Sequence, residues 1–417
     1  MVSISKKDFS KWYNQILELA EIVDIRYPVK GMPVYMPFGF SLLKKLFDYL
    51  EYLLNSSNHK QVLFPLLISE DDFEKESEHI RGFKNEVFIT SDDERKLIVR
   101  PTSETAMYPM LKLWLKSHAQ LPYKIHQTCC VYRNETKSTR PLIRGREVFW
   151  NEAHTVHENY EDSVKHHKEA VEIYKKFFDS LLINYVILVR PEHDKFPGAI
   201  YTFEFDNIMP DGKILQIGTV HNLGQNFSKA YDFKILMRDN KMDYPYQLCY
   251  GISMRSLAAL ISIHGDEKGL VLPINYTQYK FVIIPIVKNE NKLEILDYCK
   301  KIKHELEQIN EKNSVVIDQS DKSSGEKHYY WELKGVPFRI EIGERELNEM
   351  KLFIKDRLGN KYSIKFDSLN KEFVNKLEKE FDDKIKQKAT ELFKSLLNKI
   401  EKKDDFKNLK GVGIAGW

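Results

Sequence analysis

The stretch from Val131 to His154 reads VYRNETKSTRPLIRGREVFWNEAH, and it decides how this 417-residue chain is interpreted. Two strand-like halves flank a basic loop, which predicts a β-hairpin. Alternate residues of a strand lie on the same face. A face that served only a hydrophobic core would carry apolar side chains, so this one is predicted to hold a charged ligand. The residues predicted to share it are Arg133 and Glu135 on the first half and Trp150, Glu152 and His154 on the second.

The loop of the hairpin is strongly basic. A salt bridge on a solvated face would explain Arg133 and Glu135 taken alone. An arginine fork, however, donates two parallel hydrogen bonds to a phosphate or carboxylate, and a glutamate can accept from an exocyclic amine such as that of adenine. The surrounding cations therefore favour a polyphosphate ligand. They are Lys137, Arg140, Arg144 and Arg146.

Composition limits the protein class. The chain is 42% hydrophobic and 30% charged, as in ordinary globular proteins, and its length suggests two or three domains. A net charge of +3 restricts nucleic-acid binding to local patches. The four cysteines show no CxxC spacing, so neither disulfides nor a zinc or other metal site is expected. The sequence has no signal peptide and no apolar run of membrane-spanning length, so we expect a cytoplasmic protein without membrane contact.

Residues 1–275 predict an α+β domain. Strand-like runs follow one another with few helices between them, which indicates a largely antiparallel sheet. The apolar run Val62–Ile68 is predicted as an edge strand or a subunit contact, because it contains Pro65. The pair His166–His167 lies in a charged helical segment and is expected to be solvated. The expected helices are Ser41–Leu54, Glu104–His118, Asn159–Leu182 and Ser253–His264.

The composition changes near residue 275. Strand and helix patterns alternate over 276–366, which predicts a separate small α/β domain. Over 367–417 we expect a C-terminal helical segment, because apolar residues recur every three or four positions from Phe373 to Ile400.

Three further segments have both a functional and a structural interpretation. Arg255 falls in a first helical turn, after the possible N-cap Ser253, where the helix dipole disfavours a cation; a ligand contact and a surface position remain equally open. In RPTSET, Thr102 or Ser103 can cap a helix, or Glu104 can bind an ammonium group. Phe196, Gln216 and His221 lie near glycine turns, which are weak signals by themselves.

Taken together, these segments resemble the class II aminoacyl-tRNA synthetases, and closely the prolyl-tRNA synthetases of the archaeal/eukaryote-like type. RYPVKG and the strand with Pro65 resemble motif 1, YRNE with RPLIRGREVFWNEAH resembles motif 2, and GISMRSLAALISIHGDEKGLVLP resembles motif 3. Four more segments are similar to family segments and occur in the same order: RPTSET, KFPGAIY, HNLGQNF and WELKGVPFRIEIG.

The resemblance implies a class II catalytic domain with an anticodon-binding domain, and a proline–tRNA ligase without a cis-editing domain. It implies ATP with Mg²⁺, L-proline and tRNA(Pro) as ligands, and a homodimer through motif 1. Arg133 and Arg255 would be catalytic. The implied ATP-binding residues are Arg133, Glu135, Arg144, Gln216, Thr219 and Arg255. The implied proline-binding residues are Thr102, Glu104, Arg133, Trp150, Glu152, His154, Phe196, His221 and Ser253.

In the second domain the resemblance implies that Glu332 and Arg339 read anticodon bases. The family often has phenylalanine where this chain has His328. Relatives of this type continue past GIAGW into a small, often zinc-binding domain; this sequence stops at Trp417, and it leaves open whether that domain is absent or truncated. Two alternatives share the same fold: a class II synthetase for another amino acid, such as threonine, serine, glycine or histidine, and a non-catalytic synthetase-like regulator. The regulator is disfavoured, because the arginines of motifs 2 and 3 are present.

Overall fold

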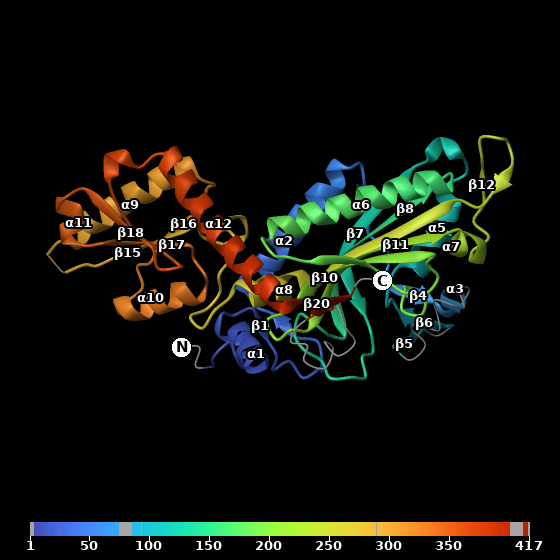
Figure 1. Cartoon of the computed structure of the whole chain (residues 1–417), viewed down its shortest axis with the longest axis horizontal. Coiled ribbons are helices and arrows are strands. Elements are labelled where there is room, and N and C mark those ends of the chain that lie inside the picture. The colour runs from blue at the N-terminus through green and yellow to red at the C-terminus, as the bar shows by residue number, and fades with distance from the viewer. Residues whose placement is uncertain (1–3, 75–85, 93, 289, 401–411, 416–417) are drawn as a thin grey trace.

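The computed structural model describes residues 4–74, 86–92, 94–288, 290–400 and 412–415. Figure 1 shows a larger lobe, formed by the elements from α1 (Phe9–Leu19) to η2 (Ile274–Tyr276), and a smaller lobe that begins with β15 (Phe281–Pro285). The long helix α12 (Lys371–Leu396) runs between the two lobes (Figure 1).

A seven-stranded sheet in the order β3-β7-β8-β14-β11-β10-β9 forms the centre of the larger lobe. Its neighbours pair antiparallel except β3 and β7. The expected α+β fold with a largely antiparallel sheet is therefore confirmed. The strands are β3 (Lys60–Gln61), β7 (Tyr123–Tyr132), β8 (Glu147–His157), β9 (Val186–Val189), β10 (Tyr201–Ile208), β11 (Ile214–Gly224) and β14 (Tyr246–Ser253).

Helices α1, α2 (Pro37–Ser56), α6 (Tyr160–Ser180) and α8 (Arg255–His264) share one hydrophobic core with this sheet. In Figure 1, α6 and α2 lie along the sheet. The four expected helices are present, with ends that differ by a few residues. The remaining elements of the lobe are β1 (Val23–Asp24), β2 (Val34–Tyr35), β4 (Leu67–Ser69), α3 (Glu70–Glu74), β5 (Phe88–Ser91), β6 (Lys96–Val99), α5 (Glu104–Trp114), η1 (His118–Gln120), α7 (Asn226–Ala230), β12 (Ile235–Leu236) and β13 (Met242–Asp243).

The single strand expected over Val62–Ile68 is wrong. The chain leaves the large sheet after β3 and enters a three-stranded sheet, β4-β6-β5, at Leu67. Pro65 has no N–H to donate, and the N–H of Phe64 donates to the side-chain oxygen of Gln127 at 2.9 Å instead of to a strand. The backbone between the two sheets therefore has no continuous ladder.

The smaller lobe is an α/β domain, as expected. Its sheet has the order β16-β15-β17-β18-β19, parallel at β16–β15 and β15–β17 and antiparallel at the other two pairs. The elements after β15 are α9 (Lys292–Ile309), β16 (Val315–Ile317), α10 (Ser324–Leu333), β17 (Phe338–Ile342), α11 (Glu344–Asn348), β18 (Lys351–Asp356), β19 (Lys361–Lys365) and η3 (Phe366–Ser368).

Helix α12 packs against both lobes. Val374, Leu377, Phe381 and Ile385 belong to the core of the smaller lobe, and Ala389 belongs to that of the larger one. The expected helix is confirmed as far as Leu396. Its continuation to Ile400 is wrong, because Leu397–Ile400 forms β20, which pairs in parallel with β21 (Val412–Ala415). Among the described residues, no helix has the length and apolarity needed to cross a membrane.

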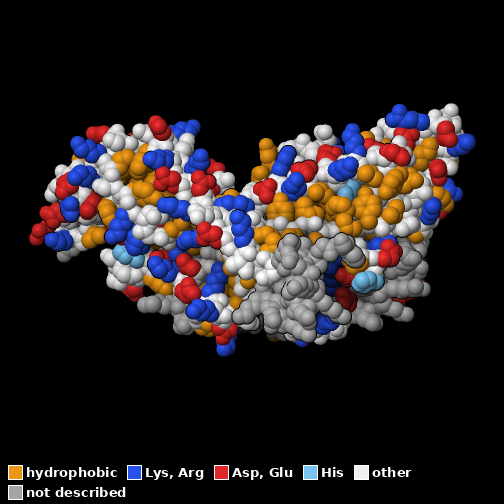
Figure 2. All heavy atoms as spheres, in the orientation of Figure 1, with side chains coloured by type: hydrophobic (Ala, Val, Ile, Leu, Met, Phe, Trp, Pro, Cys, Tyr) orange, Lys and Arg blue, Asp and Glu red, His pale blue; other side chains and the backbone are white. Residues whose placement is uncertain are grey.

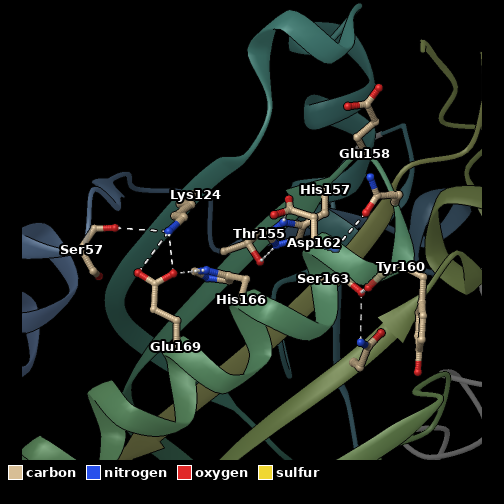
Figure 3. Close-up of polar contacts among 12 residues, drawn as sticks. Ser57, Lys124, Thr155, His157, Glu158, Tyr160, Asp162, Ser163, His166 and Glu169 are labelled. Atoms are coloured by element: carbon tan, nitrogen blue, oxygen red, sulfur yellow. Dashed lines mark hydrogen bonds and ion pairs between the residues drawn. The ribbon is translucent and has the colours of Figure 1, made fainter. Parts of the chain in front are cut away.

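His157 of β8 and His166 of α6 lie where the first turns of α6 meet the sheet (Figure 3). The ring of His166 bonds Glu169 at 2.8 Å, and the ring of His157 bonds Asp162 at 2.7 Å. His166 and His167 are each only 3% exposed, so the expectation that they are solvated is wrong. The reason is that α6 turns both rings towards the sheet: His166 meets the Tyr250 hydroxyl of β14 at 3.1 Å, and His167 packs against Tyr201 and Phe203 of β10.

This interface should make the fold sensitive to acid. Burial lowers the pKa of His59 to about 3 and that of His167 to about 4. In the unfolded chain these histidines have a pKa of about 6.5, so below that pH they bind protons there but stay neutral in the folded chain. Stability is therefore full above pH 6.5 and falls below it. Each such histidine contributes a loss of about 1.4 kcal/mol per pH unit.

We therefore expect His59→Gln to reduce the fall in unfolding free energy between pH 6.5 and 5 by about 2 kcal/mol. Denaturant unfolding at several pH values measures this slope. The exposed His304 provides the matched control, since His304→Gln should leave the slope unchanged. Equal slopes in His59→Gln and the unmodified chain would contradict the assignment.

Candidate active site

A cavity of about 520 Å³ opens on the face of the large sheet away from α6. Trp150 and Glu152 of β8 point into it, whereas Thr155 and His157 of the same strand point towards α6, as strand alternation requires. Thirteen of the residues predicted from the sequence line this one cavity: Thr102, Glu104, Arg133, Glu135, Arg144, Trp150, Glu152, Phe196, Gln216, Thr219, His221, Ser253 and Arg255.

Three arginines meet at one end of the cavity. The Nε of Arg255 donates to the carbonyl of Ile143 at 2.9 Å, and the Nε of Arg133 donates to that of Pro101 at 3.1 Å. Burial, and then repulsion from Arg133 and Arg144, lowers the pKa of Arg255 to about 10. An anion bound between these guanidinium groups would relieve that repulsion, so this end suits a phosphate chain.

Glu135 is held in place by the loop of the hairpin. Its carboxylate accepts from the Lys137 N–H at 2.9 Å and from the Arg144 Nε at 2.5 Å. Burial by itself would raise its pKa, but these donors outweigh it and lower the pKa. Glu135 is therefore an ionised acceptor at the edge of the phosphate end of the cavity.

Two buried carboxylates form the floor. Glu104 accepts from the Thr102 hydroxyl at 2.5 Å, and Glu152 accepts from the Ser103 hydroxyl and from the Gln127 amide at 2.8 Å. Ser103 occupies the N-cap position of α5 but makes no side-chain capping bond, so the capping interpretation of RPTSET is wrong. The hydroxyls donate to the carboxylates instead. The floor thus suits a cationic amine.

His154 does not line the cavity, which corrects its predicted place in the pocket wall. It is fully buried beneath the floor, with one ring nitrogen 3.2 Å from the Tyr108 hydroxyl and the other 3.3 Å from the Glu152 carboxylate. Strand alternation predicted the correct face of β8, but along that face the cavity extends to Glu152 and not to His154. His154 orients the floor from behind.

An aromatic wall stands beside the floor. The rings of Phe196 and His221 stack, with centroids 4.5 Å apart and planes at 28°. The Thr202 hydroxyl fixes this stack, because its oxygen lies 2.9 Å from His221 Nδ1 and accepts from the Phe196 N–H at 3.1 Å. Burial lowers the pKa of His221 to about 3, so the ring is neutral and suits an apolar group.

At the start of α8, Ser253 is not the N-cap, which is Met254, although its hydroxyl accepts from the Arg255 N–H at 3.3 Å. Several lining residues were not predicted from the sequence, among them Glu86, Thr202, Glu204 and Cys249. Cys249 and Glu204 could have been predicted only from the register between strands. Cys249 lies opposite His154, and Glu204 lies opposite Thr219. Register between distant strands is not visible in one sequence.

Comparison with known proteins agrees with this geometry. Residues 83–264 match the family described as tRNA synthetase class II core domain (G, H, P, S and T), and residues 280–380 match the anticodon binding domain family. The proline–tRNA ligase of Saccharolobus islandicus is 47% identical to the chain, and the match covers 99% of this chain and 88% of the relative. That of Methanococcus vannielii is 48% identical over 95% of this chain and 87% of its own.

The chain belongs to the prolyl-tRNA synthetase family. Solved structures of the family superpose closely. Giardia lamblia prolyl-tRNA synthetase in complex with prolyl-adenylate matches with a TM-score of 0.94 and 37% identity, over 98% of this chain and 87% of that one. The Cryptosporidium parvum prolyl-tRNA synthetase complexed with halofuginone and AMPPNP matches with a TM-score of 0.93 and 28% identity, over 100% of this chain and 85% of that one.

In the anticodon-binding domain of the chain, Arg339 and Glu332 lie on different elements, β17 and α10. Arg339 donates to Glu341 at 2.9 Å, and Glu341 lies 3.1 Å from the ring of His328. Burial lowers the pKa of His328, and the nearby charge of Arg339 lowers it further, whereas the charge of Glu332 raises it. Both predicted residues are therefore close to this histidine. Glu332 also meets Lys268 of the larger lobe at 3.4 Å.

Proposed function

We propose that this member of the family activates L-proline with ATP and then transfers the prolyl group to tRNA(Pro). The chain is thus an aminoacyl-tRNA ligase. The observation that carries the proposal is the layout of one cavity, with three arginines at one end and buried Glu104 and Glu152 with an aromatic wall at the other. The first end suits the phosphates of ATP and the second suits the amine and ring of proline.

The site residues have distinct roles in this reaction. Activation is an in-line attack of the proline carboxylate on the α-phosphate, which brings two anions together. Arg133 would hold the carboxylate and the α-phosphate, and Arg255 the γ-phosphate, so that fixed positive charge stabilises the transition state. Glu104 and Thr102 would hold the imino group, and Phe196 with His221 would contact the ring. Glu135 would accept from the adenine amine. Arg144, Gln216 and Thr219 would support the nucleotide.

The acidic side of the phosphate end fits Mg²⁺ bound with ATP. Glu204 lines the cavity, and the adjacent Asp206 has a buried oxygen without a hydrogen-bond partner in the described structure. Carboxylate oxygens are the ligands that Mg²⁺ prefers, and Mg²⁺ would screen charge on the phosphates. We propose that Glu204, which lines the cavity and also contacts Arg190 and Gln216, holds it with Asp206 behind it.

Domain roles and assembly belong to the same proposal. Residues 1–275 would catalyse activation, 276–366 would read the anticodon, and 367–417 would form a C-terminal segment that is helical through α12. Pairing of two chains through the motif 1 region would explain exposed apolar residues near Pro65, namely Leu63, Leu66 and Leu67. Since its substrates are ATP, proline and tRNA, we place the protein in the cytoplasm. Basic and acidic side chains mix over the face in Figure 2, so tRNA would be held at local sites.

ATP–pyrophosphate exchange with each of the twenty amino acids tests the proposal. Proline should give the largest kcat/KM. Preference for threonine, serine, glycine or histidine would instead assign the chain to another class II specificity, and no exchange with any amino acid would favour the non-catalytic alternative.

We also predict measurable activation of alanine. Alanine is smaller than proline and loses only apolar contact with the ring pocket, which discriminates by ~1–3 kcal/mol per methylene. Residues 134–254, all described, form five strands of the sheet (β8, β9, β10, β11 and β14), helices α6 and α7 and a short hairpin (β12 and β13), so a separate hydrolytic domain has no place between motifs 2 and 3. Pre-charged Ala-tRNA(Pro) should therefore survive incubation with the enzyme, and deacylation well above the spontaneous rate would refute this.

A further inference from the structure

Three metal-binding side chains from distant segments meet at the floor of the cavity and directly beneath it. Glu104 comes from α5, His154 from β8 and Cys249 from β14, and their ligand atoms all lie within 4.8 Å of one another. It is the one such group found among the described residues. The three are 1%, 0% and 7% exposed, so the fold holds them in place.

Strand register explains the cluster. Cys249 lies directly opposite His154 where β14 pairs with β8, which brings their side chains to the same face. The Cys249 thiol donates to the Glu104 carboxylate at 3.0 Å, which closes the third side. Glu104 and Cys249 line the cavity, so a fourth ligand can approach from it, whereas His154 lies beneath.

The donor set matches a particular ion chemistry. Zn²⁺ takes thiolate sulfur, imidazole nitrogen and carboxylate oxygen in four-coordinate sites, and sites with three protein ligands leave one position open. A ligating histidine usually bonds a carboxylate or another acceptor through its other nitrogen. His154 has such partners in place, Glu152 at 3.3 Å and the Tyr108 hydroxyl at 3.2 Å. One of these contacts would give way to the metal and the other would remain.

The charge around the floor also favours a cation. Glu152 is 2% exposed and adds a second carboxylate beside Glu104. The guanidinium of Arg133 is attracted to four carboxylates at once. They are those of Glu104, Glu152, Glu86 and Glu135. Burying several carboxylates is costly unless positive charge is close, so the floor attracts a further cation.

We propose that Glu104, His154 and Cys249 form a binding site for a soft divalent cation, best matched by Zn²⁺, that occupies the position of the proline imino group. Metal and proline then exclude each other. Binding replaces the S–H bond of Cys249 with a sulfur–zinc bond and releases that proton to solvent, so the apparent affinity rises with pH. The competition with proline rests on the proposed function; the metal site itself does not.

Titration of the whole chain with Co²⁺, a spectroscopic substitute for Zn²⁺, tests the site directly. We expect a thiolate-to-cobalt charge-transfer band that Cys249→Ser removes and that excess proline also removes. Cys299 is also buried but lies in the smaller lobe, so Cys299→Ser is the matched control and should keep the band. No band at saturating Co²⁺, or a band that persists in Cys249→Ser, would overturn the site.

Two further measurements keep the test decisive. If Cys249→Ser fails to fold, as judged by circular dichroism, displacement of Co²⁺ by proline in the unmodified chain decides alone. In ATP–pyrophosphate exchange with buffered free Zn²⁺, the apparent KM for proline should rise linearly with Zn²⁺ while that for ATP stays constant; inhibition that excess proline does not reverse contradicts the proposal. Absence of proline activation would refute the proposed function only, because the cobalt band reports the site without it.

Discussion

Replacement of Arg133 or Arg255 by alanine is expected to lower proline-dependent ATP–pyrophosphate exchange by about 10²–10³-fold, as loss of one charged contact in a water-excluded site does. Both guanidinium groups line the phosphate end of the cavity, and repulsion from Arg133 contributes to the lowered pKa of Arg255. Removal of Arg255 relieves repulsion in the site, whereas removal of Arg133 also removes attraction to Glu104 and Glu152; we expect both variants to fold and to keep the oligomeric state of the unmodified chain.

Arg238 provides the matched control for this experiment. Its side chain is 78% exposed and pairs with Glu158 on the surface, so Arg238→Ala should exchange at the normal rate. Kinetics at saturating ATP and proline separate lost binding from lost transition-state stabilisation. Near-normal exchange in Arg133→Ala or Arg255→Ala would refute the assignment of that arginine to the phosphate site.

Arg339→Ala should separate charging from activation. An arginine contact with a base edge is worth ~1–3 kcal/mol, so aminoacylation of tRNA(Pro) should fall by roughly 5- to 150-fold in kcat/KM. Proline activation should be nearly unchanged, because Arg339 lies on β17 of the smaller lobe. Glu332→Ala should act in the same direction, with an added effect from its contact with Lys268 of the larger lobe.

Arg345 lies in the same module and supplies the control. Its side chain is 81% exposed and pairs with Glu349, so Arg345→Ala should charge tRNA(Pro) normally. If activation falls as far as charging in Arg339→Ala, the residue supports the fold of the module through Glu341 and does not read a base. Equal losses with tRNA(Pro) and with an anticodon-substituted transcript would lead to the same conclusion.

Local pattern accounts for what could be predicted from the sequence. The spacing of apolar residues located α2, α6, α8 and α12, because side chains three or four positions apart lie on the same face of a helix. Alternation along one strand placed Trp150 and Glu152 on the cavity side of β8. The pattern failed where the backbone found a distant partner, as at Phe64, which bonds the side chain of Gln127, and at β20, which pairs with β21.

The sequence by itself determined the family, the order of its segments and the residue types of the cavity, because these are carried by motifs continuous along the chain. Only the tertiary structure decided how deeply each side chain is buried and which residues surround it. It buried His166 and His167 under α6, withdrew His154 from the cavity, and set Cys249 against Glu104 and His154 in a site that no cysteine spacing indicated. The physical reason is that burial and strand register depend on surfaces brought together from distant parts of the chain, and a local pattern contains no record of them.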